Sequence, residues 1–112
     1  MNMHFYRKLP IPKEIKEQFP ITPELATRRE KTLNELKKIF SGESDRMVLV
    51  IGPCSADNED SVLDYIYRLC PVQEKVAEKL LIVPRIYTNK PRTTGDGYKG
   101  MLHQPDPNAA YE

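Results

Sequence analysis

The sequence has 112 residues, of which 39% are hydrophobic and 29% charged, and its formal net charge is +1. Apolar stretches stay well short of the roughly 18 residues of a membrane span, and the start of the chain mixes lysine with glutamate, unlike a signal peptide, so we expect a cytoplasmic globular protein that does not enter membranes. The balanced charge also disfavours nucleic-acid binding, which needs a strongly basic face with interleaved aromatic residues.

The first part of the chain predicts an arm followed by a helix. Residues 1–21 carry prolines and have little periodicity, which is typical of an extended arm. Thr22 is a suitable helix N-cap, Pro23 suits the first helical position, and Ser41-Gly42 ends the pattern. We therefore predict a helix from Thr22 to Phe40, whose apolar stripe consists of Leu25, Leu33, Leu36, Ile39 and Phe40.

Two short apolar runs further along predict buried strands. The first run is Met47 to Ile51, which ends at Gly52-Pro53-Cys54-Ser55, and the second is Leu80 to Val83. Both consist of β-branched and other apolar residues and are bounded by turn or polar residues. If the strands are parallel neighbours, the loops that follow them open on the same edge of the sheet, where α/β proteins bind ligands.

A helix is predicted between the two strands. Asn58 can cap it, and acidic residues in the first turn suit the positive end of the helix dipole. We expect Pro71 to break or kink this helix, so that residues 71–79 restart as a separate piece. Its expected buried face consists of Val62, Tyr65, Ile66 and Leu69, with Cys70 buried as a small hydrophobe.

The cysteine pattern contains no metal or redox motif by itself. Cys54 and Cys70 are sixteen residues apart and form no Cys-x-x-Cys pair, so a zinc ribbon and a disulfide framework are both disfavoured. Cys54 differs from Cys70 by its position at the end of a predicted strand.

The segment after the second strand has the chemistry of an anion site. Arg85 to Thr94 contains three cations within ten residues, and Thr93 and Thr94 add hydroxyl groups at its end. Arginine forks bind phosphate and carboxylate groups with paired hydrogen bonds, and lysine adds a compact charge that can also move a proton. Gly95 and Gly97 allow the backbone to approach a ligand closely. We expect Cys54 and the cluster from Arg85 to Arg92 to line one pocket.

The two strand-end motifs together resemble the type I 3-deoxy-D-arabino-heptulosonate 7-phosphate (DAHP) synthases. The motifs are Gly52-Pro53-Cys54-Ser55 and Lys90-Pro91-Arg92-Thr93-Thr94, with Arg85 five residues before Lys90. The resemblance covers the chain from about Met47 through Met101, and the segment before Met47 resembles the N-terminal extension of the alpha subtype. A Gly-Pro-Cys sequence alone would be weak evidence, but the pair of motifs is highly specific.

This resemblance implies an activity and a set of site residues. The activity is the condensation of phosphoenolpyruvate with D-erythrose 4-phosphate and the release of phosphate, which begins the shikimate route to aromatic amino acids. It implies a divalent metal ion of the Mn, Fe, Co or Zn class, with Cys54 as one ligand and the ion polarising the aldehyde. Lys90 would also transfer a proton. The implied substrate contacts are Arg85, Lys90 and Lys99 for phosphoenolpyruvate, and Pro91, Arg92, Thr93 and Thr94 for erythrose 4-phosphate.

The length of the chain limits how much of such an enzyme it can form. A (β/α)8 TIM barrel needs about 250 residues, so we expect an α/β piece with an N-terminal extension over residues 1–46 and the first two βα units of a truncated TIM barrel over residues 47–112. The family's other metal ligands, a histidine, a glutamate and an aspartate, come from later strands, and neither His4 nor His103 matches that histidine. We expect the chain alone to be inactive and the full-length enzyme to be a homo-oligomer.

Two other functions stay open on the sequence. A 3-deoxy-octulosonate 8-phosphate synthase also has a Gly-Pro-Cys strand end, although its corresponding loop reads Lys-Ala-Asn-Arg-Ser and differs from residues 90–94 here. Alternatively, the chain is a noncatalytic piece whose arm and helix bind a partner subunit. The simplest interpretations of single residues are burial for Cys54, packing for Tyr65, Tyr67 and Tyr87, and a solvated loop position for His103.

Overall fold

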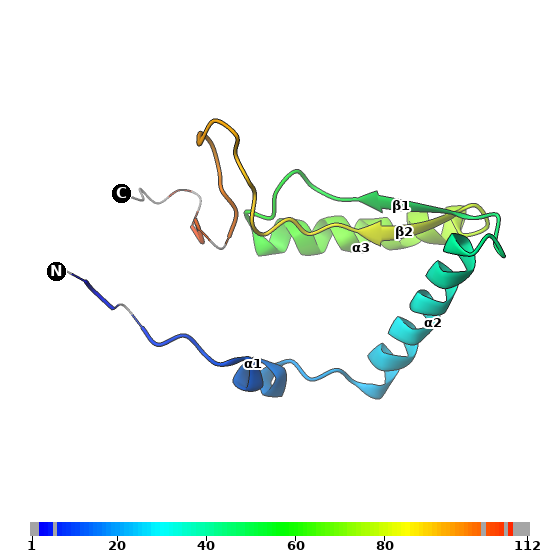
Figure 1. The fold of residues 1–112 in the computed structure, drawn as a ribbon, viewed down its shortest axis with the longest axis horizontal. Coiled ribbons are helices and arrows are strands. Elements are labelled where there is room, and N and C mark those ends of the chain that lie inside the picture. The colour runs from blue at the N-terminus through cyan, green and yellow to red at the C-terminus, as the bar shows by residue number, and fades with distance from the viewer. Residues whose placement is uncertain (1–2, 6, 102, 107, 109–112) are drawn as a thin grey trace. The chain divides into compact units, whose positions relative to one another are not determined.

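The structure is a computed structural model that describes residues 3–5, 7–101, 103–106 and 108. Figure 1 shows the elements, which in chain order are α1 (Pro12–Gln18), α2 (Pro23–Phe40), β1 (Met47–Ile51), α3 (Glu59–Val76) and β2 (Leu80–Pro84). The chain divides into two compact units, Met1–Lys37 and Lys38–Glu112.

Helix α2 confirms the predicted helix and its cap. The Thr22 hydroxyl accepts a hydrogen bond from the Leu25 amide at 3.2 Å, which satisfies one of the free N–H groups at the helix start. The Arg28 guanidinium donates to the Glu24 carboxylate at 2.8 Å, one turn away on an exposed face. Neither α1 nor α2 has a buried residue.

The prediction of an extended arm over residues 1–21 is wrong where α1 forms. Pro12 occupies the first turn of α1, a position that proline favours because its missing N–H would be unpaired there anyway. The Glu14 carboxylate accepts from the Ile11 amide at 2.8 Å and closes the helix start. The helix is too short to show an apolar period, and the prolines around it are equally compatible with an extended arm.

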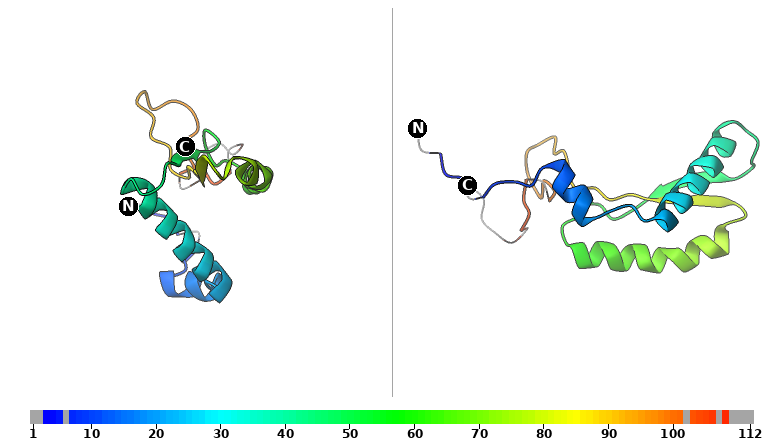
Figure 2. Two further views of the ribbon diagram at one scale, coloured as in Figure 1. Left: turned by 90° about the vertical axis from the view of Figure 1, so that its right-hand side faces the viewer. Right: turned by 90° about the horizontal axis from the view of Figure 1, so that it is seen from below.

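Strands β1 and β2 form a two-stranded parallel sheet, as the sequence predicted. Their register pairs Met47 with Leu80 and Ile51 with Pro84. Helix α3 runs antiparallel to the strands and contacts β2 (Figures 1 and 2). Both strands therefore end at the same edge of the sheet, followed by the Gly52 loop and the Arg85 loop.

Helix α3 confirms the Asn58 cap but continues through Pro71. The Asn58 side chain accepts from the Ser61 amide at 3.0 Å. The expected restart after Pro71 is wrong, because one helix spans Glu59–Val76. Proline removes the backbone hydrogen bond to the residue four positions earlier, Tyr67, whose side chain is 79% exposed. The missing bond thus falls on the solvent side, where water can replace it.

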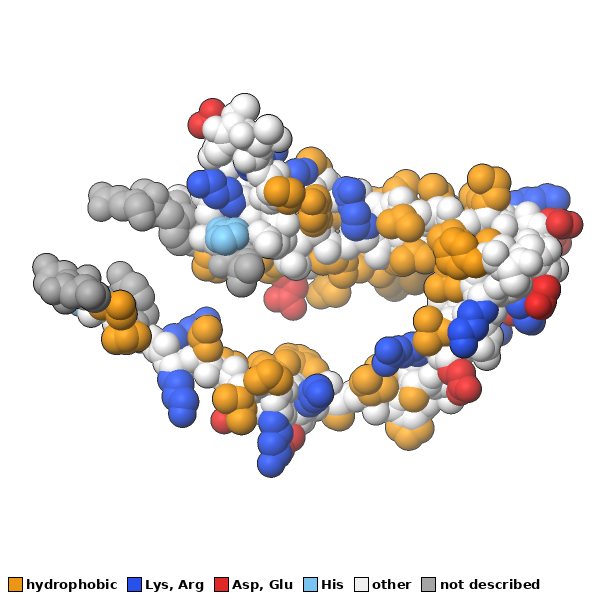
Figure 3. Space-filling model, viewed as in Figure 1, with side chains coloured by type: hydrophobic (Ala, Val, Ile, Leu, Met, Phe, Trp, Pro, Cys, Tyr) orange, Lys and Arg blue, Asp and Glu red, His pale blue; other side chains and the backbone are white. Residues whose placement is uncertain are grey.

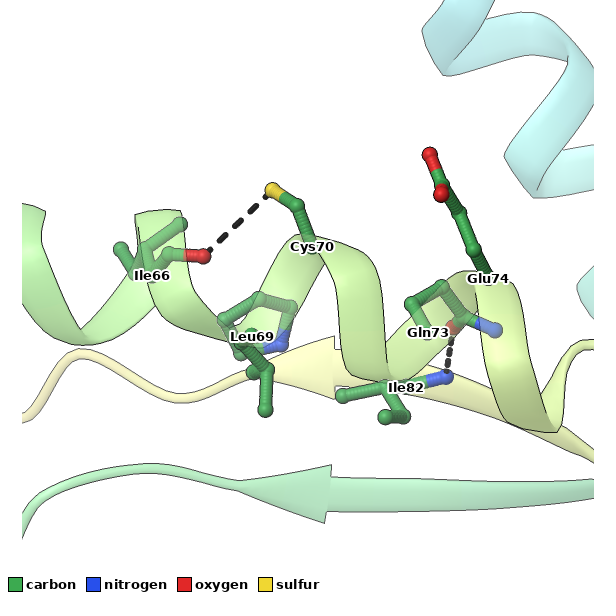
Figure 4. Close-up of a pocket in the computed structure, with 7 residues that line it drawn as sticks. Ile66, Leu69, Cys70, Gln73, Glu74 and Ile82 are labelled. Carbon is green, nitrogen blue, oxygen red and sulfur yellow. Dashed lines mark hydrogen bonds between the residues drawn. The ribbon is translucent and has the colours of Figure 1, made fainter.

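Gln73 ties the part of α3 beyond Pro71 to the sheet. Its amide nitrogen donates to the Leu80 carbonyl at 3.0 Å, and its amide oxygen accepts from the Ile82 amide at 2.6 Å. Figure 4 shows the second of these bonds between the helix and the strand. One side chain therefore satisfies two backbone groups on β2, as a neighbouring strand would.

The core of the described residues is small. Its buried hydrophobic members are Ala56 and Val62, and Val62 lies on the predicted face of α3. The prediction that Cys70 is buried is wrong: Cys70 is exposed, and its thiol donates to the Ile66 carbonyl at 3.4 Å. It lies at a hollow of about 290 Å³ between α3 and β2, lined by Ile66, Leu69, Cys70, Gln73, Glu74, Ile82 and Pro84.

Apolar side chains also lie open on the sheet. Met47 is 68% exposed and Val50 is 61% exposed, and Figure 3 shows apolar side chains on this part of the surface. Within the described residues, α3 covers one side of β2 while much of β1 stays accessible.

Among the helices of the described residues, none is long and apolar enough to cross a membrane.

Candidate functional site

Backbone hydrogen bonds join the loops that follow the two strands. The Arg85 amide donates to the Ile51 carbonyl at 2.9 Å, and the Ala56 amide donates to the Tyr87 carbonyl at 3.0 Å. Gly52 makes this approach possible, because a Cβ atom there would overlap the Arg85 carbonyl. The Gly-Pro-Cys loop and the cationic loop are therefore held against each other.

Lys90 and Arg85 reach across from the second loop to the first. The Lys90 ammonium donates to the Cys54 carbonyl at 2.7 Å and also contacts the Cys54 sulfur. The Arg85 guanidinium donates to the Pro53 carbonyl at 3.0 Å. Two cations from one strand end thus surround the cysteine at the other.

The surroundings of Cys54 favour its thiolate form. The hydrogen bond from Lys90 and the positive charge of Lys90 lower the pKa of the Cys54 thiol, and Arg92 and Arg85 add smaller contributions in the same direction. Cys54 is exposed, so solvent and ligands can reach it. An accessible, electropositive environment of this kind is typical of reactive or metal-binding cysteines.

The ring of Tyr87 lies beneath both cations. Its centroid is 5.3 Å from the Arg85 guanidinium carbon and 5.7 Å from the Lys90 nitrogen, within the range of cation–π attraction. Tyr87 was interpreted as a packing residue on the sequence. A usable signal existed, because side chains two positions apart in an extended segment, such as Arg85 and Tyr87, point to the same side.

A second group of cations surrounds a hollow of about 390 Å³. It is lined by Lys90, Arg92, Gly95, Lys99 and His103. Figure 3 shows lysine or arginine side chains and a histidine on the surface of this unit. Among the described residues that line the hollow, none is acidic, so it suits an anion with one or more phosphate or carboxylate groups. The interpretation of His103 as a solvated loop residue does not predict this position.

The backbone at Tyr98 and Lys99 anchors the cationic loop. The Lys90 amide donates to the Lys99 carbonyl at 2.9 Å, and the Arg92 Nε donates to the Tyr98 carbonyl at 2.8 Å. The Tyr98 hydroxyl donates to the Gln104 carbonyl at 3.2 Å and lies 3.4 Å from the Ala56 carbonyl of the first loop. The sequence did not single out Tyr98 or Gln104.

The expected site residues fall into two adjoining groups that share Lys90. At the strand ends Lys90 contacts Cys54 and Arg85 contacts the neighbouring Pro53, while Arg92 and Lys99 line the hollow together with Lys90. We expected Cys54 and the cluster from Arg85 to Arg92 to line one pocket. Of these residues, Lys90 and Arg92 line the hollow, and Cys54 and Arg85 do not. The remaining expected residues are exposed on the same loop and outside the lining of the hollow: Pro91, Thr93 and Thr94.

Cys54 could supply one ligand to a metal ion. The Cys54 thiolate is a donor that Zn and Fe accept readily. Within the part of the chain that the structure describes, no three His, Cys, Asp or Glu side chains gather to hold an ion. A catalytic divalent ion needs about three protein ligands, so no chemical step can be assigned to a metal from these residues alone.

Comparison with known proteins places this arrangement in a family. The sequence pattern of the DAHP synthetase I family matches residues 18–112. The chain is 36% identical over 107 residues to the phospho-2-dehydro-3-deoxyheptonate aldolase of Corynebacterium glutamicum, covering 96% of this chain and 29% of that protein. It is 37% identical over 107 residues to the phenylalanine-inhibited phospho-2-dehydro-3-deoxyheptonate aldolase of Saccharomyces cerevisiae, with 96% and 29% covered.

A solved structure agrees with the sequence comparison. The phospho-2-dehydro-3-deoxyheptonate aldolase of Francisella tularensis superimposes with a TM-score of 0.77 and 30% identity, over 93% of this chain and 30% of that chain. The chain therefore spans about 29% of the length of the curated relatives that it matches. On the combined match of sequence and structure, the chain belongs to the DAHP synthetase I family.

Proposed function

We propose that residues 47–101 form part of the active site of a DAHP synthase, which condenses phosphoenolpyruvate with D-erythrose 4-phosphate. One observation carries the proposal: Lys90 from the second strand end contacts both the carbonyl and the sulfur of Cys54 at the first. A cysteine and a lysine from distant motifs are thereby combined with the cations of one loop. The choice of reaction is supported by the relatives, which are named phospho-2-dehydro-3-deoxyheptonate aldolases.

The cations suit the substrates that this reaction requires. Phosphoenolpyruvate carries a carboxylate and a phosphate on three carbons, and Arg85, Lys90 and Lys99 can pair with them. Arg92, together with the hydroxyls of Thr93 and Thr94 and the ring of Pro91, would contact the phosphate of erythrose 4-phosphate. Tyr87 supports Arg85 and Lys90 from below, which limits the freedom of both side chains.

The half-buried Lys90 ammonium is also a candidate proton donor. In the condensation, C3 of phosphoenolpyruvate bonds to the aldehyde carbon, the aldehyde oxygen gains a proton, and water is consumed as phosphate leaves. A lysine ammonium held beside the substrates can supply that proton as a general acid. Cys54 would be one ligand of a divalent ion, which supplies Lewis-acid polarisation of the aldehyde when bound.

The fold and the extension have proposed places in the same enzyme. The parallel pair β1 and β2 with α3 would be the opening strands of a (β/α)8 barrel, supported by the superposition on the Francisella tularensis structure. Residues 1–46 would be an extension that contributes to contacts between subunits. Exposed apolar side chains on this segment, such as Leu25 and Phe40, suit such contacts.

A graft tests the proposed function. The 107 matched residues of the Corynebacterium glutamicum enzyme would be replaced by those of this chain. We expect the purified graft to form DAHP from phosphoenolpyruvate and erythrose 4-phosphate, and the isolated chain to form none. A folded graft that binds metal yet forms no DAHP would contradict the proposal, and so would DAHP formation by the isolated chain.

A further inference from the structure

The turn that follows Lys99 holds the cationic loop through one side chain, Gln104. The Gln104 amide oxygen accepts from the Lys99 amide at 2.6 Å. The Gln104 backbone amide donates to the Gly100 carbonyl at 2.8 Å, and its carbonyl accepts from the Tyr98 hydroxyl at 3.2 Å. Three separate groups of Gln104 thus bond to the segment from Tyr98 to Gly100.

The segment from Tyr98 to Gly100 in turn anchors two cationic residues, Lys90 and Arg92. The Lys99 carbonyl accepts the Lys90 amide, and the Tyr98 carbonyl accepts the Arg92 Nε. Lys99 itself lines the hollow with them. Hydrogen bonds therefore hold the backbone on both sides of the Lys99 α-carbon. The Lys99 N–H donates to Gln104, and the Lys99 C=O accepts from Lys90.

Close packing leaves little alternative for this turn. Gly100 is buried and has φ +99°, and a Cβ atom at this position would overlap the Thr88 carbonyl. Only glycine adopts such a conformation readily. Because Gly100 has no side chain, the turn packs directly against the backbone of the cationic loop. Gln104 closes the turn on its other side.

We propose that Gln104 is a positioning residue, which holds Lys90, Arg92 and Lys99 around the hollow in the arrangement that binds the phosphorylated substrates. The inference rests on the proposed function, because it concerns the affinity of that same site. Gln104 lies outside the lining of the hollow. It acts through the backbone to which the cations are attached, and pre-organised cations lose less conformational entropy when an anion binds.

The variant Gln104→Met removes the amide oxygen while keeping the length of the side chain. In the active graft, its KM for phosphoenolpyruvate should rise roughly fivefold, the factor that corresponds to about 1 kcal/mol for one neutral hydrogen bond. Its kcat should stay within about twofold, as expected when binding rather than chemistry is impaired. Gln18→Met, the same substitution on the exposed α1, is the matched control.

A second variant tests whether misfolding explains the rise in KM. Tyr98→Phe removes the hydroxyl bonded to Gln104 and keeps the carbonyl that holds Arg92. It should raise the same KM, and the double variant should show less than the sum of the two effects, because both act through one clamp. In the graft, the Lys99 amide should exchange faster with solvent in Gln104→Met than in the parent graft.

The outcomes separate the inference from the proposed function. If the parent graft is active and Gln104→Met leaves the KM and the Lys99 amide unchanged, the inference is overturned and the proposed function stands. An equal loss of kcat in Gln104→Met and Gln18→Met would overturn it as well. If the parent graft is itself inactive, the failure is that of the proposed function.

Discussion

At the scale of single residues, the cysteine and the lysine of the site depend on each other. Lys90 donates to the carbonyl of a residue 36 positions earlier and contacts its sulfur. The hydrogen bond from Lys90 and its positive charge outweigh the opposing effect of desolvation, so the pKa of the Cys54 thiol is lowered. The same ammonium therefore serves the cysteine and faces the anion hollow.

The pH dependence of Cys54 alkylation should report this contact. Because the lowered pKa belongs to the deprotonation of the thiol, Cys54 should react with iodoacetamide at lower pH than an ordinary thiol, whose pKa is about 8.5. Lys90→Met should shift the profile to higher pH and slow alkylation at pH 7. The measurement uses a Cys70→Ser background with a metal chelator present.

Lys75→Met is the control for this experiment, because Lys75 is an exposed lysine on α3. It should leave the alkylation profile unchanged. A Lys90→Met profile identical to that of the parent chain would show that the ammonium does not control the thiol.

At this scale, the sequence predicted the chemistry better than the geometry. Cys54, Arg85 and Lys90 could be singled out because each lies at or just after a predicted strand end. Their contacts depend on loop conformation, which no periodicity encodes. Gln104 was missed for the same reason, since an amide in a loop has no distinctive pattern until its partner, the Lys99 amide, is placed beside it.

At the scale of elements, the strands and long helices followed their patterns, and the exceptions have local causes. Apolar runs predicted β1 and β2, and the Thr22 and Asn58 caps marked the starts of α2 and α3. The predicted break at Pro71 was wrong, because the energetic cost of a proline depends on which side of the helix loses a hydrogen bond. The compensating bonds from Gln73 to β2 join residues that sequence reasoning does not pair.

Replacing Gln73 should loosen the edge of β2. In a graft that carries Gln73→Met, the Ile82 amide loses its acceptor, so its hydrogen exchange should speed up, and the local opening free energy should fall by roughly 1–3 kcal/mol. The Arg85 amide, which donates to Ile51 within the sheet, should keep its protection and report that the sheet remains.

Hydrogen exchange followed by NMR measures both amides at once. Lys75→Met places the same residue on the same helix and should leave Ile82 unaffected. Equal Ile82 exchange in Gln73→Met and the parent graft would mean that the side chain does not protect this edge.

At the scale of the whole molecule, little apolar surface is removed from water. Among the described residues the buried hydrophobic ones are Ala56 and Val62, whereas Met47, Val50 and many others are more than half exposed. A two-stranded sheet with one helix is marginal alone, because the free energy of burial barely offsets chain entropy. The exposed apolar surface is what the opening part of a barrel would offer to further strands.

The isolated chain should therefore unfold without a sharp transition and should associate at high concentration. Calorimetry and circular dichroism against temperature measure the first, and sedimentation measures the second. A cooperative transition with an enthalpy near 0.7 kcal/mol per residue, the value typical of globular domains at about 60 °C, would contradict this expectation. It would favour an independent module that binds a partner.

DAHP formation in grafts that differ only at one lysine tests whether the two strand ends form one catalytic site around Lys90. Lys90→Met removes the ammonium that contacts Cys54 and lines the hollow, while Lys75→Met removes an exposed ammonium on α3. We expect kcat/KM for phosphoenolpyruvate to fall at least about a hundredfold in Lys90→Met, as when a general acid is lost, and to stay near the parent value in Lys75→Met. A Lys90→Met graft that forms DAHP as fast as the parent would contradict the account.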